Sequence, residues 1–293
     1  MSLLLLKIIR QRCLTLALLG ALALAGCNAV KLGYEQGPSL LYWWLDGHLD
    51  FDSTQNTKVR EALERLQRWH RQNELLPAAD LLARMANLAQ GPIESEQACQ
   101  ITREAQTQLD RLMREAIRSA SPVATTLGAA QIGHLTTHLE RKNVRWEEQW
   151  LQGSTAARQQ RRLDKLVDRY ADLYGSLSTE QVNLLRQQLD PSVWSPEWGR
   201  RERLRQQRDL LNALMHIEQE HLPPKQAEAA LQGVWERWLK PTAETDRQRW
   251  QTWIEQGCKN FAELHASTSP EQRQRAVRRL RAYEKDLREL AAR

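Results

Sequence analysis

The chain has 293 residues, of which 41% are hydrophobic and 27% are charged. This balance is typical of a globular protein and excludes a disordered one, and the length allows one or two domains. The formal net charge is +6, but Lys7, Arg10 and Arg12 supply three of these charges near the N-terminus. Without them 6 − 3 leaves +3, too small an excess to indicate a nucleic-acid-binding protein.

The N-terminus, "MSLLLLKIIRQRCLTLALLGALALAGC", has the layout of a signal peptide. A basic patch precedes an apolar run from Cys13 to Ala25, and small residues lead into Gly26 and Cys27. An apolar helix of that length spans about 20 Å, which is short of the ~30 Å hydrocarbon core of a bilayer. We therefore expect a cleaved signal rather than a permanent transmembrane helix.

The end of this segment, Leu24-Ala25-Gly26-Cys27, resembles a bacterial lipoprotein signal. The resemblance implies cleavage before Cys27, with a diacylglyceryl group on its sulfur and an acyl chain such as palmitate on its new amino group. Asn28 follows, where an Asp would favour retention at the inner membrane, so the resemblance implies the periplasmic face of the outer membrane. An ordinary secretory signal that contains a cysteine is the alternative.

These features divide the chain into three parts. Residues 1–26 are expected to be the signal peptide and residues 27–38 a short lipidated tether, since Gly33, Gly37 and Pro38 interrupt it. The remaining residues, 39–293, are expected to fold as one all-α domain.

The fold class follows from periodicity. Apolar side chains recur every three to four positions in the mature chain, no segment alternates at period two, and no Asn-Gly or Asp-Gly hairpin occurs. We predict an all-α multi-helix bundle or an elongated array of helical hairpins, with two lobes allowed by a break near 151–155 or 190–196. The expected helices are 38–47, 53–73, 77–90, 94–119, 123–151, 155–174, 179–189, 196–220, 224–239, 243–265 and 270–292, with breaks at prolines and glycines that include Pro77 and Pro122.

Three helix starts carry a capping box, in which the cap side chain and the side chain three residues later bind each other's backbone. The pairs are Asp52 with Gln55, Ser178 with Gln181, and Ser269 with Gln272. The starts at 178, 223 and 269 lie about 45 residues apart, as in a repeated helical hairpin. Capping alone is the other explanation of the motif.

The stretch "LSTEQ" at 177–181 is similar to the L-T-x-x-Q signature of the Spy/CpxP group of periplasmic chaperones, and "TSPEQ" at 268–272 is a weaker match. The likeness covers few residues, and those chaperones are much shorter than this chain. It implies a chaperone-like holdase by analogy only.

A wider resemblance rests on "LLYWWLDGHLDFDSTQ", "LQRWHRQNELLPAADLL", "LSTEQ", "WERWLKP" and "HASTSPEQRQRAVRRLRAYEKDLREL". Together these are similar to a family of proteobacterial lipoproteins of unknown function. The block Trp69-His70-Arg71 and the following Glu74 carry much of it, and the extra Leu76 before Pro77 departs from the pattern. The resemblance implies a helical, lipid-anchored envelope protein and brings no catalytic residues. We take Trp69, His70 and Arg71 as a possible binding surface.

The cysteines fit an exported protein. Cys13 leaves with the signal and Cys27 carries lipid, so Cys99 and Cys258 remain as an even pair. In an oxidising compartment they are expected either to form a disulfide or to stay as two buried thiols. No Cys-x-x-Cys occurs, so the sequence favours neither a zinc ribbon nor a redox site.

Catalytic motifs are missing from the sequence: it has no Gly-x-Ser-x-Gly, no His-Glu-x-x-His and no phosphate-binding glycine loop. His134 and His138 share a helix face, but no third metal ligand is obvious. We therefore expect no enzyme activity, no cofactor and no metal. The eleven tryptophans pack either in the core or in an exposed aromatic groove, and Trp43 and Trp44 suit a membrane interface.

The function expected is a non-catalytic binding or assembly role in the periplasm. The membrane is a partner through the N-terminal lipid, and envelope proteins or peptidoglycan are further candidates. The arginine clusters at 158–162, 200–208 and 273–281 are interrupted by acids and Gln, as on a solvated face, with contact to anionic lipid or glycan phosphate as the alternative. Nucleic acid is not expected. A holdase and a peptidoglycan-acting hydrolase are the alternative functions.

Overall fold

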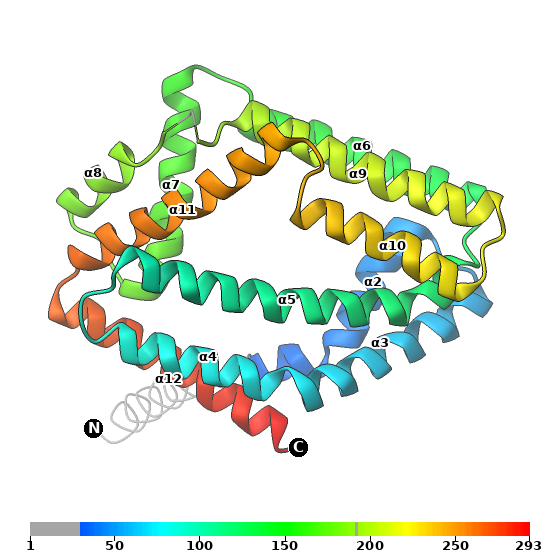
Figure 1. Cartoon of the computed structure of the whole chain (residues 1–293), viewed down its shortest axis with the longest axis horizontal. Helices are drawn as coiled ribbons and strands as arrows, with labels where there is room; N and C mark the ends of the chain where they lie inside the picture. The colour runs from blue at the N-terminus through cyan, green and yellow to red at the C-terminus, as the bar shows by residue number, and fades with distance from the viewer. Residues whose placement is uncertain (1–29, 191–192) are drawn as a thin grey trace, which may run out of the picture.

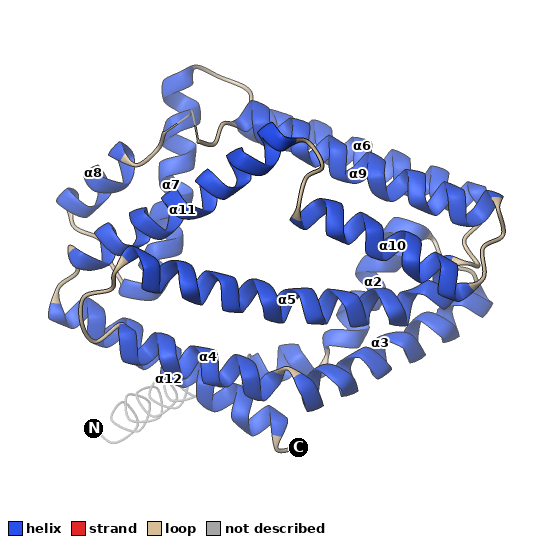
Figure 2. Cartoon of the chain, in the orientation of Figure 1, coloured by secondary structure: helices blue, strands red, loops and turns tan. Residues whose placement is uncertain are grey.

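The computed structural model describes residues 30–190 and 193–293, and within them every regular element is a helix (Figures 1 and 2). The predicted all-α fold is therefore confirmed. The signal peptide and Cys27 lie outside the described residues. The helices are α2 (Gly37–Leu49), α3 (Ser53–Asn73), α4 (Leu75–Leu88), α5 (Ser95–Ala124), α6 (Ala129–Trp150), α7 (Thr155–Tyr174), α8 (Thr179–Gln187), α9 (Pro196–Gln219), α10 (Pro224–Leu239), α11 (Glu244–Ala266) and α12 (Pro270–Ala291).

The predicted break at Pro122 is wrong, because α5 continues through this residue to Ala124. A proline inside a helix leaves the carbonyl four residues earlier without its amide donor. Here that carbonyl belongs to Arg118, and the Ser121 hydroxyl donates to it at 3.0 Å. The hydroxyl replaces the missing hydrogen bond.

The break predicted at Pro77 falls earlier, at Glu74, and α4 begins at Leu75. Pro77 therefore sits in the first turn of α4, where its missing N–H would have had no partner inside the helix. The Glu74 side chain is buried and accepts two hydrogen bonds from Arg111 of α5, both at 2.9 Å. This bidentate pair ties the α3–α4 joint to α5.

The tether predicted over 27–38 is shorter than expected. Residues 30–35 are helical and α2 follows at Gly37. Lys31 forms an ion pair with Asp286 of α12 at 3.3 Å and a second one with Glu289. Gly33 does not interrupt the chain, because contacts with α12 hold this segment in place.

The helices form two lobes that share α5 (Figure 1). The first lobe contains α2, α3, α6, α9, α10 and the C-terminal half of α5, and its core includes Val59, Leu63, Ile217 and Leu231. The second lobe contains α4, α7, α8, α11, α12 and the N-terminal half of α5, and its smaller clusters of buried side chains include Leu163, Leu185, Leu264 and Leu280.

The lobes are not consecutive in the sequence. The chain passes from the first lobe to the second between α3 and α4 and returns along α5. It passes over again between α6 and α7, returns between α8 and α9, and crosses a third time between α10 and α11. The segments 151–155 and 190–196, where a lobe boundary was expected, are two of these crossings. Neither divides the chain into two sequential domains.

Each lobe has one corner where two capping glutamines bind each other. In the first lobe, Gln55 Nε2 donates to Gln131 Oε1 at 3.1 Å and Gln131 Nε2 donates to Gln55 Oε1 at 2.7 Å. Gln55 also donates to the Thr126 carbonyl at 2.7 Å, and Gln131 to the Asp50 carbonyl at 2.9 Å. Both carbonyls lie two residues before the cap of the opposing helix.

The second lobe repeats this arrangement at the starts of α8 and α12. Gln181 and Gln272 exchange amide hydrogen bonds at 2.8 and 3.0 Å. Gln181 donates to the Ser267 carbonyl at 3.0 Å and Gln272 to the Ser176 carbonyl at 2.9 Å, again two residues before the opposing cap. The similarity of "LSTEQ" and "TSPEQ" thus reflects a joint between two helix starts.

The sequence predicts a helical-hairpin repeat from the helix starts at 178, 223 and 269. The two glutamine corners do not follow this repeat. The start at 223 has no side-chain cap hydrogen bond. The matching starts belong instead to α3 with α6 and to α8 with α12.

We predict that Gln181→Ala lowers the free energy of unfolding by about 2–4 kcal/mol, because it removes a cap and leaves buried backbone groups without partners. Urea unfolding followed by circular dichroism measures the effect. The double variant with Gln272→Ala should cost less than the sum of the two single variants.

Gln248→Ala is the matched control, since Gln248 is exposed and bonds only to Glu244 one turn away. Its cost should stay within about 0.5 kcal/mol. An equal loss in Gln181→Ala and Gln248→Ala would contradict the role of the corner.

Candidate functional site

Of the two apolar cavities described below, the larger lies in the second lobe and has a volume of about 830 Å³. Its walls come from α4, α5, α7, α8, α11 and α12 and are largely apolar. This size and character are typical of a site for a small molecule. Wall residues include Met85, Leu88, Ile101, Leu166, Ile254 and Phe261.

Helix α7 gives this cavity an apolar wall and a basic rim. Leu166, Tyr170 and Leu173 line the wall one turn apart, while Lys165 and Arg169 line the cavity but remain exposed. Residues three and four apart share a helix face, so α7 has an apolar face and a basic face. The cavity lies along the boundary between these two faces.

Arg162 lies one turn before Lys165 on the same rim and is half-buried. Its guanidinium sits 4.6 Å from the centroid of the Trp194 ring. Burial lowers the pKa of Arg162, and the nearby charge of Asp190 opposes this effect. Arg162 is therefore held by the protein's own groups.

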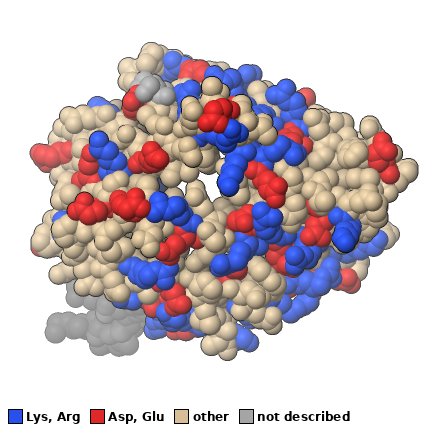
Figure 3. Space-filling model, in the orientation of Figure 1, with Lys and Arg blue, Asp and Glu red and all other residues tan. Residues whose placement is uncertain are grey.

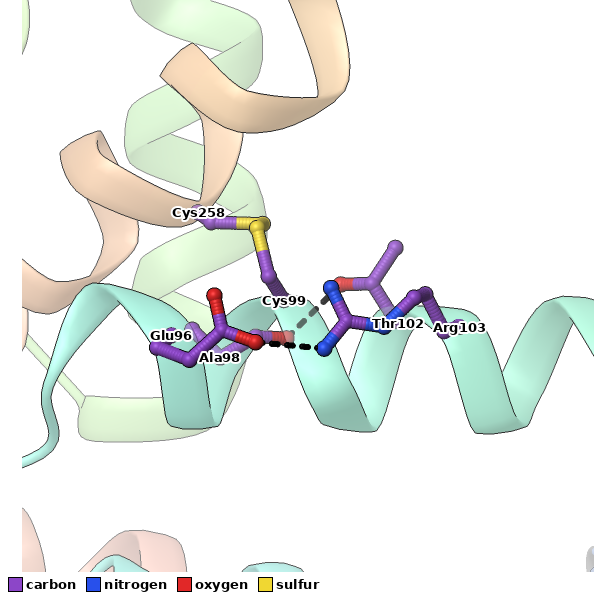
Figure 4. Close-up of a disulfide and its surroundings, with 6 residues drawn as sticks. All are labelled: Glu96, Ala98, Cys99, Thr102, Arg103 and Cys258. Atoms are coloured by element: carbon purple, nitrogen blue, oxygen red, sulfur yellow. Dashed lines mark hydrogen bonds and ion pairs between the residues drawn. A yellow bond between two sulfur atoms is a disulfide. The ribbon is translucent and has the colours of Figure 1, made fainter. Parts of the chain in front are cut away.

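A disulfide between Cys99 and Cys258 joins α5 to α11 at the cavity wall (Figure 4). The Cα atoms are 5.3 Å apart and both residues are buried. The bond closes a loop over a sequence separation of 159 residues, which in the chain-entropy model stabilises the fold by roughly 5 kcal/mol at most. It also fixes the distance between two walls of the cavity.

Behind the wall, His265 is fully buried between two hydrogen-bond partners. Its Nε2 lies 2.8 Å from the Gly91 carbonyl, so Nε2 carries the proton and donates. Nδ1 then accepts from the Tyr174 hydroxyl, also at 2.8 Å. Burial lowers the pKa of His265 and raises that of Tyr174, so both side chains are neutral near pH 7.

The smaller cavity, about 470 Å³, lies in the first lobe between α2, α3, α5, α6, α9 and α10. It is also mainly apolar, with Lys142 and Arg203 among its lining residues. His48 donates from Nδ1 to the Trp44 carbonyl at 2.6 Å, and its Nε2 lies 3.1 Å from Lys142 Nζ. These contacts fix the orientation of the His48 ring, with Nε2 accepting from the Lys142 ammonium.

In the pair His134 and His138, considered above as metal ligands, His138 contacts a third histidine. His138 packs against His48, with ring centroids 4.0 Å apart, and its pKa is lowered by burial and by nearby positive charges. Residues 30–190 and 193–293 contain no group of three or more His, Cys, Asp or Glu placed to bind a metal ion. His134 and His138 alone do not make a site.

At the predicted binding surface of Trp69, His70 and Arg71, two of the side chains contact the N-terminal helical segment. His70 Nδ1 lies 3.1 Å from the Tyr34 hydroxyl, and Arg71 donates to Glu35 at 3.0 Å. All three block residues are only partly exposed. His70 and Arg71 thus hold residues 30–35, which the sequence predicts to be part of a tether.

The tryptophans divide between the two roles that were considered. Trp198 and Trp235 are buried, and Trp235 donates to Asp110 at 2.8 Å. Trp43 and Trp44 are 65% and 55% exposed, and Trp253 is 40% exposed at the larger cavity. The three-to-four spacing of the pairs places a side chain on a helix face, but it does not say what covers that face.

Basic and acidic side chains are interspersed on the face of the molecule shown in Figure 3. Several members of the arginine clusters form ion pairs, which fits the solvated face expected from the sequence. Examples are Arg158 with Glu197, Arg200 with Glu147, and Arg281 with Glu284.

Sequence reasoning missed two features of the larger cavity: the basic rim formed by Lys165 and Arg169, and the buried Tyr174–His265 pair. The rim had a signal, because the amphipathic pattern of 163–174 places basic residues beside Leu166 and Tyr170. The Tyr174–His265 contact had none, since the two residues are 91 positions apart.

The described residues form an all-helical fold with an apolar cavity in each lobe. Residues 47–225, more than half of the chain, match the model of DUF6279, a family of unknown function, and the chain belongs to this family. The match includes α4, α5, α7 and α8 of the larger cavity, whereas α11 and α12 follow it. No curated protein and no solved structure matches the chain.

Stability should depend on pH through His265. Burial lowers the pKa of His265 in the folded state below its ordinary value of 6.5, so the unfolded chain takes up a proton that the folded chain does not. The free energy of unfolding should therefore fall as the pH drops below about 6.5, and level off only below the folded pKa. His70 and His138 act in the same direction.

Urea unfolding between pH 8 and pH 4.5 measures this dependence. His265→Gln should be less stable at pH 8 and should lose less stability than the wild type on acidification, because the titrating group is gone. His216→Gln, at an exposed position of α9, is the control and should keep the wild-type slope. An unchanged slope in His265→Gln would contradict the assignment.

Proposed function

We propose that this chain is a lipid-anchored protein of the bacterial envelope with a non-catalytic binding or assembly role, and that its larger cavity is the binding site. The observation that carries the binding role is the apolar space of about 830 Å³, whose walls are joined by a disulfide. The observation that carries the anchoring is Leu24-Ala25-Gly26-Cys27 at the end of an apolar run.

The Cys99–Cys258 disulfide supports export, because disulfides form and persist in oxidising compartments such as the periplasm. We place the protein at the periplasmic face of the outer membrane, since Asn28 follows the cysteine. No helix in the described residues is long and apolar enough to cross a bilayer.

The surface of α2 supports a position close to lipid. Leu40, Leu41, Trp43 and Trp44 are all exposed and follow Cys27 by fewer than twenty residues. Tryptophan favours the membrane–water interface, where its ring is partly apolar and its N–H stays hydrated. A lipid on Cys27 would bring this surface to the bilayer.

The lining of the larger cavity favours binding over hydrolysis. Cleavage of a glycan ordinarily uses two carboxyl groups on either side of the bond. Among the described residues that line this cavity, Asp190 is the only one with a carboxyl side chain. We therefore favour the non-catalytic role over a peptidoglycan hydrolase.

A holdase is the second candidate, favoured by the exposed apolar side chains of α2, which could cover an unfolded client. Suppression of client aggregation that is lost in Trp43→Ser with Trp44→Ser would support it. The glutamine corners do not, because their amide groups are fully engaged within the fold.

We predict that Cys27→Ala releases the protein from the membrane into the soluble periplasmic fraction, because the thiol that accepts the lipid is removed. Cell fractionation with immunodetection measures the release. Cys27→Ser should behave in the same way, and Asn28→Ser should stay in the membrane. Retention of Cys27→Ala in the outer membrane, or mass spectrometry that finds residues 1–26 still attached, would contradict the anchor.

The cavity is tested with the uncharged dye N-phenyl-1-naphthylamine, whose emission rises in apolar surroundings. The protein is the mature chain with Cys27→Ser, which keeps every described residue. Gly257 lines the cavity, and a Cβ added there meets no atom within 4 Å. Gly257→Phe should therefore obstruct the cavity and weaken dye binding by about tenfold or more, equal to about 1.4 kcal/mol.

Gly133→Phe is the matched control, since Gly133 is also helical, also meets open space, and lines neither cavity. It should bind the dye as the wild type does. Absence of dye binding to the wild type, or equal binding by Gly257→Phe and Gly133→Phe, would overturn the cavity as the binding site.

A further inference from the structure

We propose that the larger cavity binds an amphiphile with a single acyl chain and an anionic head group. The acyl chain occupies the apolar interior, and the head group lies at the basic rim of α7. This inference rests on the proposed function, because it names the ligand class of the same cavity.

The rim has an excess of positive charge. The charged residues that line the cavity are three cations, Arg162, Lys165 and Arg169, and one acid, Asp190. The charge of Asp190 acts on Arg162, so the excess lies at the other two positions. An anion is the ligand group that this rim would attract.

Lys165 and Arg169 are free to bind such an anion. Neither forms an ion pair with a carboxylate of residues 30–190 or 193–293. The acids of α7 do not line the cavity; they are Asp164, Asp168 and Asp172. An arginine beside a lysine suits a carboxylate or a phosphate, because the guanidinium can donate two parallel hydrogen bonds.

The interior selects a ligand body without polar groups, since several polar atoms of the wall are already paired. The Thr102 hydroxyl donates to the Ala98 carbonyl at 2.9 Å, and the Tyr174 hydroxyl bonds to His265. The Gln256 amide donates to Asn260 at 2.7 Å. A sugar or peptide would lose hydrogen bonds to water on entering, whereas an acyl chain loses none.

The volume agrees with one small ligand and not with a folded partner. About 830 Å³ lies within the usual range for small-molecule sites. A free fatty acid and a lysophospholipid share the required chemistry, one apolar chain with one negative head group. The test therefore includes both sources.

The experiment measures displacement of N-phenyl-1-naphthylamine from the mature chain with Cys27→Ser by four probes, each kept below its micelle concentration. Dodecanoate and lauroyl-lysophosphatidylglycerol carry a negative head group, 1-dodecanol a neutral one and dodecyltrimethylammonium a positive one. The stronger anionic probe should displace the dye at a concentration about tenfold below that of dodecanol, with the cation weakest. Added salt should narrow the difference.

The head-group position is tested with Lys165→Gln and Arg169→Gln together. This variant should weaken the stronger anionic probe by roughly three- to tenfold and leave dodecanol and the dye unchanged, since exposed charge pairs contribute modestly. The control is Lys58→Gln with Arg65→Gln on α3, which removes the same charge from two exposed residues that do not line the cavity. It should bind every probe as the wild type does.

The outcomes separate the two proposals. If the dye does not bind, the proposed function and this inference fall together. If the dye binds but dodecanol equals or exceeds both anions, or if the α7 variant matches the α3 control, only the amphiphile is overturned. A preference for one anion over the other identifies a fatty acid or a lysophospholipid as the source.

Discussion

The hydroxyl of Ser121 makes the shared helix possible, because it supplies the hydrogen bond that Pro122 takes away from α5. As a result α5 runs unbroken for 30 residues, from Ser95 to Ala124. Its N-terminal half is bonded to α11 through Cys99, and its C-terminal half belongs to the core of the first lobe. Both lobes, and with them both cavities, depend on the continuity of this one helix.

The glutamine corners show how a local signal acquires a tertiary role. A capping box satisfies backbone groups at the start of its own helix, and this needs only a residue three positions after the cap. In each lobe two such glutamines also meet across the fold, and each gives its second N–H to a carbonyl before the other helix. The amide groups are then fully used, which fixes the angle between the paired helices and the shape of the space behind them.

The larger cavity has walls that are fixed in place and an inner surface that offers few free hydrogen-bonding groups. The disulfide and the Tyr174–His265 contact hold its walls, and several polar atoms of those walls are paired within the protein. What remains open is an apolar interior with positive charge along α7. A lipid-anchored protein with such a site would hold an apolar molecule away from water beside a membrane, which is the basis of the binding role that we propose.

The sequence by itself determined most of the helices and three of their capping boxes, because periodicity and capping act between residues that are neighbours in the chain. It indicated Cys99 and Cys258 as a pair only because they were the two cysteines left. The passage of α5 through Pro122, the packing of residues 30–35 against α12 and the Tyr174–His265 pair were decided by the tertiary structure. Each depends on which surfaces meet, and residues up to about 250 positions apart in the chain meet only after the helices have packed.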